Sequence, residues 1–215
     1  MATLIPSIIS PDCTSPGEQE IFSKLRDDPF TKDWIALHSL DIAHHRKQVS
    51  GEIDYVVIIP SKGVLCLEVK ACESLHRDHG LWYYGINPKP DPKGPFKQAS
   101  DAMHSIKDRL FRQRPDLKTV VFWSAVIFPY IDFTIESGEW HLWQVVDRRK
   151  YQAEPIGKLL ERVLKSARQH LRNKGLGWFR NDSIEPSIDQ SKLIAKVLRP
   201  NFEFHVSRIR GQVCS

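Results

Sequence analysis

Two short apolar runs joined by a turn constrain the fold of this 215-residue chain more than any other feature. Residues 53–59 are rich in β-branched side chains, residues 60–63 (Pro-Ser-Lys-Gly) form a turn sequence, and residues 64–69 continue as a second apolar run. β-Branched residues favour strands, whereas proline and glycine favour turns. Because both runs are apolar at consecutive positions, we expect two adjacent central strands that are covered on both faces.

Three helices are predicted around this strand pair. Ser15-Pro16-Gly17-Glu18 is typical of a helix start, and the first helix should run to about Asp27. Residues 85–95 contain four prolines and two glycines, which excludes regular structure there, and a second helix should begin at about Phe96. A third, strongly amphipathic helix is predicted from Ile156 to near Gly175. The apolar stripe of the second helix is Ala99, Ala102, Met103, Ile106 and Leu110.

The remaining segments complete the predicted order of elements. Residues 120–128 are expected to form a third strand and residues 141–146 a fourth. Residues 1–14 show no periodicity and are interpreted as an N-terminal arm, and the segment with Trp34, Leu37 and Leu40 as a polar connection. The resulting order is helix, two strands, helix, two strands, helix, which predicts an α/β sandwich with a mixed central sheet.

The overall composition is that of a soluble globular protein with a weak preference for polyanions. The formal charge is +5, but 26 acidic residues accompany the 31 basic ones, so the charge alone is weak evidence for nucleic acid. The four cysteines (Cys13, Cys66, Cys72 and Cys214) are far apart, and Cys66 is expected to be a small core residue. We therefore expect no disulfide framework, no membrane association and a cytoplasmic location.

The two central strands carry the residues that point to chemistry. Glu68 and Lys70 share one face of the second strand, because side chains alternate along a strand. Any hairpin loop with an odd number of residues places Asp54 on that same side, and a three-residue loop with Gly63 in a left-handed conformation would do so. Two registers remain open, with Asp54 opposite either Glu68 or Lys70, and in both the three groups fall within roughly 5–8 Å of each other.

Two carboxylates that converge from apolar strands need a compensating cation, because buried charges are costly when unpaired. Oxygen-only ligation suits Mg²⁺ or Mn²⁺, and such an ion can activate a water and polarise a phosphoryl oxygen. Lys70 could then orient the water or offset developing negative charge. For an isolated Glu-x-Lys on a strand the simpler interpretation is an ion pair, but the Asp54 that precedes the hairpin favours a metal centre.

These residues also carry a resemblance to a known family. Residues 51–59 (Gly-Glu-Ile-Asp-Tyr-Val-Val-Ile-Ile), followed by Gly63-Val64 and by Leu67-Glu68-Val69-Lys70, closely resemble the nuclease-related domain called NERD, a branch of the PD-(D/E)xK nucleases. The similarity covers about residues 15–175. Further matching positions are Gly17-Glu18 with Ile21 and Leu25, and Asn87-Pro88 before Gln98-Ala99. The long proline-rich insertion before Gln98 departs from the compact spacing of the family.

The resemblance implies a restriction-endonuclease-like sandwich with a defined active site. In that site Asp54 and Glu68 would be metal ligands together with the backbone carbonyl of Val69, and Lys70 would be the catalytic lysine. Glu18 would be an acidic residue contributed by the first helix, as a further ligand or catalytic group.

Two of these candidates have structural alternatives. Glu18 could complete a capping box with the Ser15 amide, although it also lies on the inward face of its helix, before Ile21 and Leu25. Gln98 opens the second helix, where its amide could bind a phosphate, hold a catalytic carboxylate or simply be a polar residue of the first turn.

The C-terminal residues 179–215 are interpreted as a tail that follows a nuclease-like domain at 15–178. From about Ser187 the tail weakly resembles the lead-in to a superfamily-1 helicase, with Gln190 as the glutamine and Gly211 where a phosphate loop would open, so a helicase or ATPase module is a candidate partner. A small terminal helix and strand that pack on the domain explain the pattern equally well. Elsewhere, Cys72, His76 and His79 lack a fourth ligand at a zinc-like spacing, and we predict no zinc site there.

We therefore predict a Mg²⁺- or Mn²⁺-dependent nuclease that hydrolyses DNA phosphodiester bonds. The alternative is a catalytically silent nucleic-acid-binding or assembly module of the same fold that works with a helicase partner.

Overall fold

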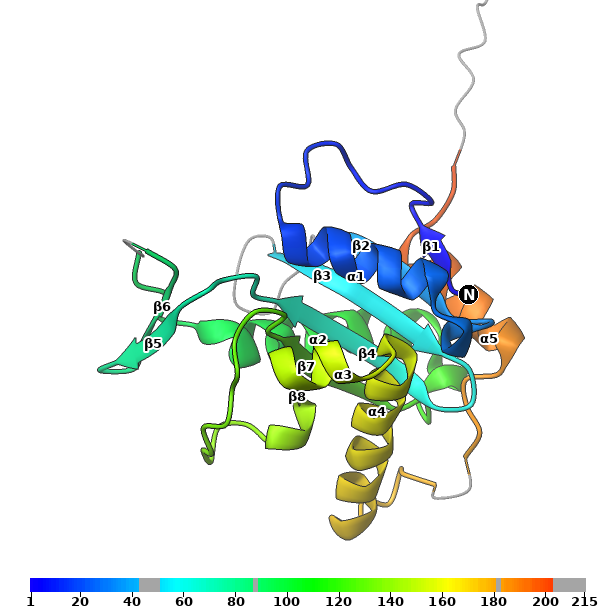
Figure 1. The fold of residues 1–215 in the computed structure, drawn as a ribbon. Coiled ribbons are helices and arrows are strands. Elements are labelled where there is room, and N and C mark those ends of the chain that lie inside the picture. The colour runs from blue at the N-terminus through cyan, green and yellow to red at the C-terminus, as the bar shows by residue number, and fades with distance from the viewer. Residues whose placement is uncertain (43–50, 87–88, 181–182, 203–215) are drawn as a thin grey trace, which may run out of the picture.

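The computed structural model of the chain describes residues 1–42, 51–86, 89–180 and 183–202. A six-stranded mixed sheet with flanking helices confirms the predicted α/β sandwich (Figure 1). In spatial order the strands of the sheet are β1 (Thr3–Ile5), β2 (Ile35–Ile42), β3 (Gly51–Ile59), β4 (Gly63–Val69), β7 (Phe122–Ile127) and β8 (Val145–Val146). The α-helices are α1 (Pro16–Asp27), α2 (Gly94–Gln113), α3 (Arg148–Ala153), α4 (Ile156–Asn173) and α5 (Ile188–Leu198), and the short 3₁₀ helices are η1 (Pro29–Thr31), η2 (Pro115–Leu117) and η3 (Leu142–Gln144).

The sheet is antiparallel in its centre and parallel on its outer sides. β3 pairs antiparallel with β2 and with β4, so the predicted hairpin is confirmed. β1 lies parallel to β2, β7 parallel to β4, and β8 parallel to β7. The sequence-distant β7 therefore covers the edge of β4, which makes β4 a central strand.

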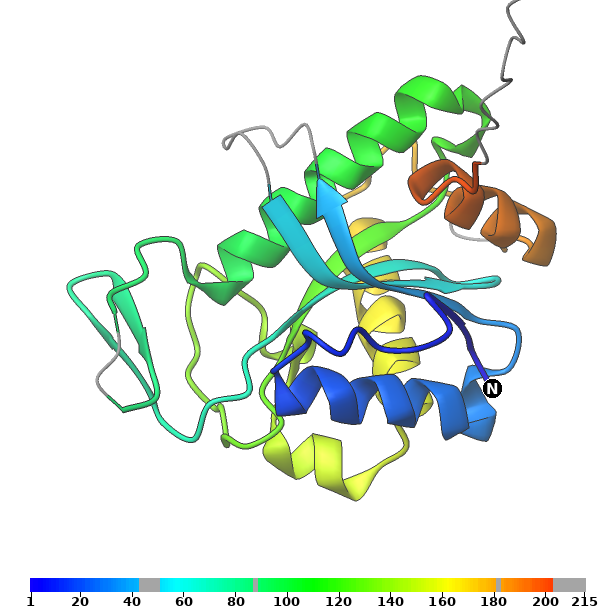
Figure 2. The ribbon, with the colours of Figure 1, turned by 90° about the horizontal axis from the view of Figure 1, so that it is seen from above.

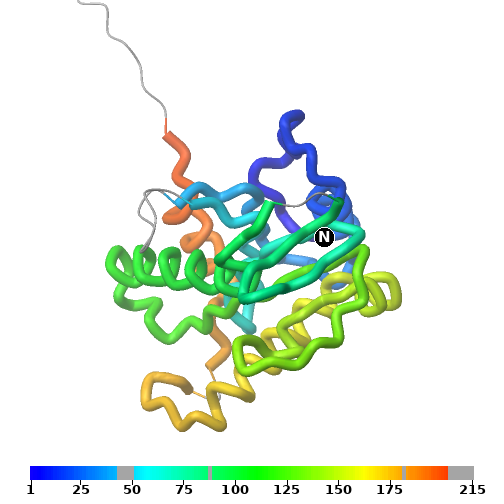
Figure 3. The backbone as a smooth tube through the Cα atoms, turned by 90° about the vertical axis from the view of Figure 1, so that its left-hand side faces the viewer, coloured from blue at the N-terminus to red at the C-terminus, as the bar shows by residue number. Residues whose placement is uncertain are grey.

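Two helical layers bury the sheet from both sides, and Figure 3 shows them on either side of it. Leu65 and Leu67 of β4 pack in one core with residues of α1 and α4, whereas Val64 and Cys66 pack in the other core with residues of α2 and α5. All seven residues of β4 are buried. The consecutive apolar run of this strand is thus explained by coverage on both faces, as predicted.

Two strands lie in segments that were expected to be irregular. The expected polar connection around Leu37 and Leu40 is strand β2, which was missed because His38, Ser39 and Asp41 interrupt its apolar pattern. Strand β1, within the expected N-terminal arm, has only three residues and is too short to show a periodicity.

A second, two-stranded sheet was also missed. β5 (Leu75–Asp78) and β6 (Leu81–Tyr84) form a hairpin, and Trp82 of β6 packs in an aromatic cluster with Phe96, Phe128, Phe133 and Trp140. The predicted fourth strand at 141–146 is only β8, because residues 142–144 form a 3₁₀ helix. The aromatic cluster fixes the start of α2 and the hairpin against the end of β7.

The turn between β3 and β4 has the predicted length but not the predicted conformation. The pair Ile59–Gly63 closes a three-residue loop, and the left-handed residue in it is Ser61, with φ of 63°. Gly63 has φ of 145°, and a Cβ atom there would lie 2.5 Å from the carbonyl oxygen of Val121. Glycine is therefore needed at 63 for the close approach of the chain before β7.

Helix α5, in the segment interpreted as a tail, packs on the domain. Its buried residues Ile194, Ala195 and Leu198 belong to the core shared by α2, β2 and β3. Gln190 completes a capping box with Ser187, a structural role at the helix start. Beyond the helix, the guanidinium of Arg199 donates to the carbonyl oxygens of Ile5 and Ser39, at 2.7 and 2.6 Å.

Several sequence predictions lie outside the described residues, namely those on Asn87-Pro88, Gly211 and Cys214. Among the helices in the described ranges, none combines the length and the apolar character that a membrane crossing requires.

Candidate functional site

The centre of the site is a fork in the sheet between β3 and β4. The last pair of their ladder is Tyr55–Leu67, and its register places Asp54 opposite Glu68, the first of the two predicted registers. Beyond this pair β3 continues with β2, whereas β4 continues with β7 as far as Val69 (Figure 2). The two central strands therefore separate at the residues that carry the acidic side chains.

Asp54 bridges the two arms of the fork. Its Oδ2 accepts a hydrogen bond from the backbone amide of Val69 at 2.6 Å. If β3 had stayed paired with β4, a backbone carbonyl oxygen of β3 would accept from this amide. The Asp54 carboxylate takes the place of that carbonyl. The carbonyl group of Val69, expected from the resemblance to be a ligand, belongs to the last residue of β4 at the same fork.

Glu68 and Lys70 lie together at the end of β4. Glu68 is only 6% exposed, and Lys70 Nζ donates to its Oε1 at 2.6 Å. Lys70 is also fixed by its backbone amide, which donates to the carbonyl oxygen of Ile127, and its Nζ lies 5.4 Å from the ring centroid of Tyr84. The Glu68–Lys70 ion pair, which was the simpler interpretation of these residues, is thus present, and Asp54 is a second carboxylate beside it.

The electrostatics of the fork show an excess of negative charge. Burial, and then the charge of Glu68, hold the pKa of Asp54 well above its ordinary value. Burial also raises the pKa of Glu68, although the neighbouring Lys70 opposes this. For Lys70, burial acts to lower the pKa, but the nearby carboxylates outweigh it and the pKa is raised. One lysine does not compensate the acidic groups, so an additional cation fits the centre.

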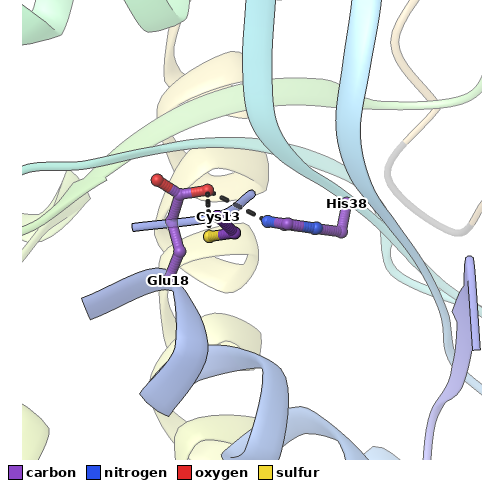
Figure 4. A group of neighbouring side chains, drawn as sticks. All are labelled: Cys13, Glu18 and His38. Carbon is purple, nitrogen blue, oxygen red and sulfur yellow. Dashed lines mark hydrogen bonds and ion pairs between the residues drawn. The ribbon is translucent and has the colours of Figure 1, made fainter. Parts of the chain in front are cut away.

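Glu18 reaches the edge of this centre from α1. Ser15 caps the helix by accepting from the Glu18 amide, but the Glu18 carboxylate does not complete the capping box that was one interpretation of it. Its Oε2 lies 3.0 Å from His38 Nε2 and accepts from Cys13 Sγ at 3.8 Å, while the other oxygen points away from both (Figure 4). The hydrogen bond with His38 lowers the pKa of Glu18, and the charge of Glu18 raises the pKa values of Asp54 and Glu68.

A glycine allows α1 to approach the fork. A Cβ atom on Gly17 would lie 2.7 Å from Ala71 Cβ and 3.2 Å from both Val69 Cγ1 and Pro129 Cγ. The N-terminal turn of α1 therefore rests directly on the chain that leaves β4. The pair Gly17-Glu18 combines this close contact with an acidic group beside it.

Gln98 contacts a carboxylate that the sequence prediction did not include. Its Nε2 donates to Asp91 Oδ2 at 2.7 Å, and Asp91 also accepts from the Tyr84 hydroxyl and from the Lys93 amide. The charge of Asp91 raises the pKa values of both Glu68 and Lys70. Of the roles considered for Gln98, holding a carboxylate is the one with an observed contact.

Asp91 and His38 were missed for different reasons. Asp91 lies in the proline-rich insertion, where its only signal is an acidic residue between the end of β6 and the start of α2. His38 lies in strand β2, which the sequence analysis did not predict.

The three residues for which no zinc site was predicted each have a partner of their own. Cys72 donates to the carbonyl oxygen of Lys70, and the ring of His76 stacks on that of Tyr83. The ring of His79 lies 2.9 Å from the carboxylate of Asp78.

Comparison with known proteins gives one match. Residues 14–129, more than half of the chain, match the family model described as the nuclease-related domain. This range contains all the candidate residues at the fork, and the mixed sheet with its flanking helices is consistent with a restriction-endonuclease-like nuclease fold. No curated protein and no solved structure shows significant similarity to the chain.

Proposed function

The chain belongs to the nuclease-related domain family, and from this premise we propose that it is a nuclease that hydrolyses phosphodiester bonds of DNA with a bound Mg²⁺ or Mn²⁺ ion. Asp54 and Glu68 would hold the ion, with the Val69 carbonyl as a further oxygen donor. Lys70 would be the catalytic lysine. The metal is inferred from the oxygen donors of the fork, and the phosphodiester substrate from the nuclease-related family to which the chain belongs.

The observation that carries the proposal is the pair of acidic groups, Asp54 and Glu68, on strands that are otherwise buried. Their negative charge exceeds what Lys70 compensates, and Glu18 and Asp91 add to it. A protein gains no stability from such an arrangement unless a cation is bound to it. The donors are oxygen atoms, which suit a hard divalent ion.

The protein residues have separable roles in this proposal. A divalent ion held there would supply Lewis-acid charge next to the scissile phosphate. Lys70, fixed through its backbone amide and its ion pair with Glu68, can donate a hydrogen bond to the attacking water or to a phosphate oxygen as negative charge develops. Gln98 holds Asp91, and Asp91 in turn strengthens the negative field around Lys70.

A basic cavity near the start of α2 supports a nucleic-acid substrate. It has a volume of about 410 Å³ and is lined by Arg77 of β5 and by Lys93 and Lys97. Arg77 is paired there with Glu139 at 3.0 Å and Lys93 with Asp101 at 3.4 Å, so a phosphate would compete with these carboxylates. Lys93 is tied through its amide to Asp91. Cations in such a position can contact backbone phosphates without reading the base sequence.

One observation favours the second candidate function, a silent nucleic-acid-binding or assembly module that works with a helicase or ATPase partner. Lys70 already neutralises Glu68 at 2.6 Å, as a purely structural ion pair would. The two candidates differ in what Mn²⁺ does to the protein, because an ion that binds only the folded state raises its stability.

The test is cleavage of supercoiled plasmid and of end-labelled single-stranded DNA with Mg²⁺, Mn²⁺ or chelator. The variants are Glu68→Gln and, as a matched control, Glu73→Gln, whose side chain is exposed just beyond the site. We expect metal-dependent cleavage by the wild type and by Glu73→Gln but not by Glu68→Gln. Binding of DNA without cleavage in every metal condition, with no stabilisation by Mn²⁺, would establish the silent module instead.

A further inference from the structure

A second group of metal-ligating side chains lies beside the acidic fork. Cys13 comes from the segment before α1, Glu18 from the first turn of α1, and His38 from β2 (Figure 4). Their ligand atoms, one thiol sulfur, one carboxylate oxygen and one imidazole nitrogen, all lie within 4.8 Å of one another. Three chain segments that are distant in sequence thus converge on one point.

The two distances from Glu18 Oε2 to the other ligand atoms are close to the edges of a tetrahedral metal site, and the third distance is at most 4.8 Å. Zinc binds nitrogen or oxygen at about 2.0–2.1 Å and sulfur at about 2.3 Å, so tetrahedral geometry separates an oxygen from a nitrogen by about 3.3 Å and from a sulfur by about 3.5 Å. The observed distances are 3.0 Å from Glu18 Oε2 to His38 Nε2 and 3.8 Å from Cys13 Sγ to Glu18 Oε2. Small side-chain movements would bring all three atoms to bonding distance of one ion.

The surrounding structure holds the three side chains in place. His38 is 1% exposed, and its ring packs against Tyr55 at 4.8 Å between centroids. The Tyr55 hydroxyl donates to the Glu18 carbonyl oxygen, which fixes the first turn of α1. Gln19 Nε2 donates to the carbonyl oxygen of Cys13 at 2.7 Å and so fastens the cysteine backbone to the same helix. The arrangement is therefore preorganised by contacts outside the cluster.

An ion could reach this cluster from solvent. Cys13 and Glu18 line an open cavity of about 400 Å³, and the acidic residues Asp12 and Glu52 lie on its wall. The opening carries negative charge, because three carboxylates, those of Asp12, Glu18 and Glu52, line this one cavity. A cation is thus drawn to the opening, and water or a wall carboxylate can fill a fourth position.

We propose that Cys13, Glu18 and His38 form a binding site for a zinc-class transition metal ion, separate from the site at Asp54 and Glu68. Thiolate and imidazole ligands select borderline ions such as Zn²⁺, whereas oxygen-only ligands select Mg²⁺ or Mn²⁺. On binding, the thiol proton of Cys13 passes to solvent, and the sulfur, Glu18 Oε2 and His38 Nε2 coordinate the ion. Such an ion would join the N-terminal segment, α1 and β2, and it would keep the Glu18 carboxylate away from the neighbouring site. The inference does not rest on nuclease activity.

The test is titration of the metal-free protein with Co²⁺, a spectroscopic substitute for zinc, followed by displacement with Zn²⁺. We expect one equivalent of Co²⁺ to give a thiolate charge-transfer absorption that excess Mg²⁺ does not remove. Cys13→Ser should abolish the absorption, and it should also abolish the rise in melting temperature that Zn²⁺ gives the wild type. Cys72→Ser, which alters another partly buried cysteine, should keep both responses.

The separate identity of the site has its own control. Asp54→Asn removes a proposed ligand of the other ion and should leave the Co²⁺ absorption unchanged. The proposal is overturned if the wild type gives no charge-transfer absorption, if Cys13→Ser retains it, or if Asp54→Asn loses it. Cys13→Ser is nearly isosteric and lies outside the regular elements, so its own melting curve without metal confirms that it folds.

Discussion

The carboxylate of Asp54 accepts a hydrogen bond from the backbone amide of Val69, 2.6 Å away, at the point where β3 and β4 separate. One side chain therefore satisfies a strand end that has lost its neighbour and also presents negative charge next to Glu68. The hydrogen bond from Val69 favours the ionised carboxylate of Asp54, whereas burial and the charge of Glu68 disfavour it, and the first prediction follows from that conflict.

Asp54→Asn should stabilise the metal-free protein at neutral pH. The folded-state pKa of Asp54 is raised, chiefly by burial and then by Glu68. A raised pKa means that the stability is complete below the unfolded-state value of about 3.9 and is lost as the pH rises through the folded-state pKa. Asparagine escapes this loss and can still accept from Val69. Urea unfolding with chelator should therefore show a gain at pH 7 that disappears near pH 3.

The same variant should fail to respond to metal. Mn²⁺ should raise the urea midpoint of the wild type at pH 7 but not that of Asp54→Asn. Asp116→Asn, which alters an exposed carboxylate paired with Arg114, should behave like the wild type in both experiments. A metal-free Asp54→Asn that is less stable than the wild type at pH 7 would contradict the charge conflict at the fork.

Lys70→Ala should separate catalysis from metal binding. The lysine is proposed to assist the attacking water or the developing charge, and loss of such a group typically reduces the rate by about 100-fold to 10⁴-fold. Because Lys70 is not a metal ligand, Mn²⁺ should still raise the melting temperature of the variant. Lys165→Ala, on the exposed face of α4, serves as the control in the plasmid assay and should retain full activity. Unreduced cleavage by Lys70→Ala would remove the lysine from the mechanism.

Gly17→Ala should displace α1 from the fork. The new Cβ atom would lie 2.7 Å from Ala71 Cβ, an atom fixed to the backbone, so the helix or the chain after β4 must move. Overpacking of this kind costs about 1–3 kcal/mol, which exceeds the gain in helix propensity of up to about 1 kcal/mol. Thermal or urea unfolding measures the loss. Gly138→Ala, where no atom lies within 4 Å of the added Cβ, is the control, and equal stability of the two variants would argue against the close contact.

Gln98→Leu should weaken metal binding without unfolding the protein. Leucine cannot donate to Asp91, so this carboxylate loses its 2.7 Å hydrogen bond beside Glu68 and Lys70. Loss of a supporting partner near a metal centre typically reduces affinity by 10-fold to 100-fold, and we expect about 10-fold for Mn²⁺ in a calorimetric titration. Gln113→Leu, at the exposed end of the same helix, should leave the affinity unchanged. An unaltered affinity in Gln98→Leu would limit Asp91 to a structural role.

The parts of the fold that the sequence predicts well are those whose burial is uniform. β3 and β4 are covered on both faces, so their apolar runs are continuous, and the stripes of α1, α2 and α4 repeat at helical spacing. β2 was missed because three polar residues, His38, Ser39 and Asp41, interrupt the apolar pattern of its sequence. Two of these polar residues lie at the cavity side of the fold: His38 contacts Glu18, and Ser39 lines the same cavity as Cys13 and Glu18.

The candidate site was predictable where one hairpin determines it and not where distant segments meet. The register of β3 and β4 brings Asp54, Glu68 and Lys70 to one fork, and an odd loop length was sufficient to infer this. By contrast, Asp91 reaches the fork through a fold of the proline-rich insertion that depends on the packing of Trp82, Phe96 and Trp140. Contacts of that kind follow from tertiary packing, which local sequence patterns do not encode.

The two hydrogen bonds from Arg199 to the carbonyl oxygens of Ile5 and Ser39 fasten the end of α5 to the first two strands of the sheet, β1 and β2. The beginning and the end of the folded unit are therefore held side by side at one edge. Local unfolding of α5 should therefore also loosen β1 and the edge of the sheet, because the two are held by the same side chain.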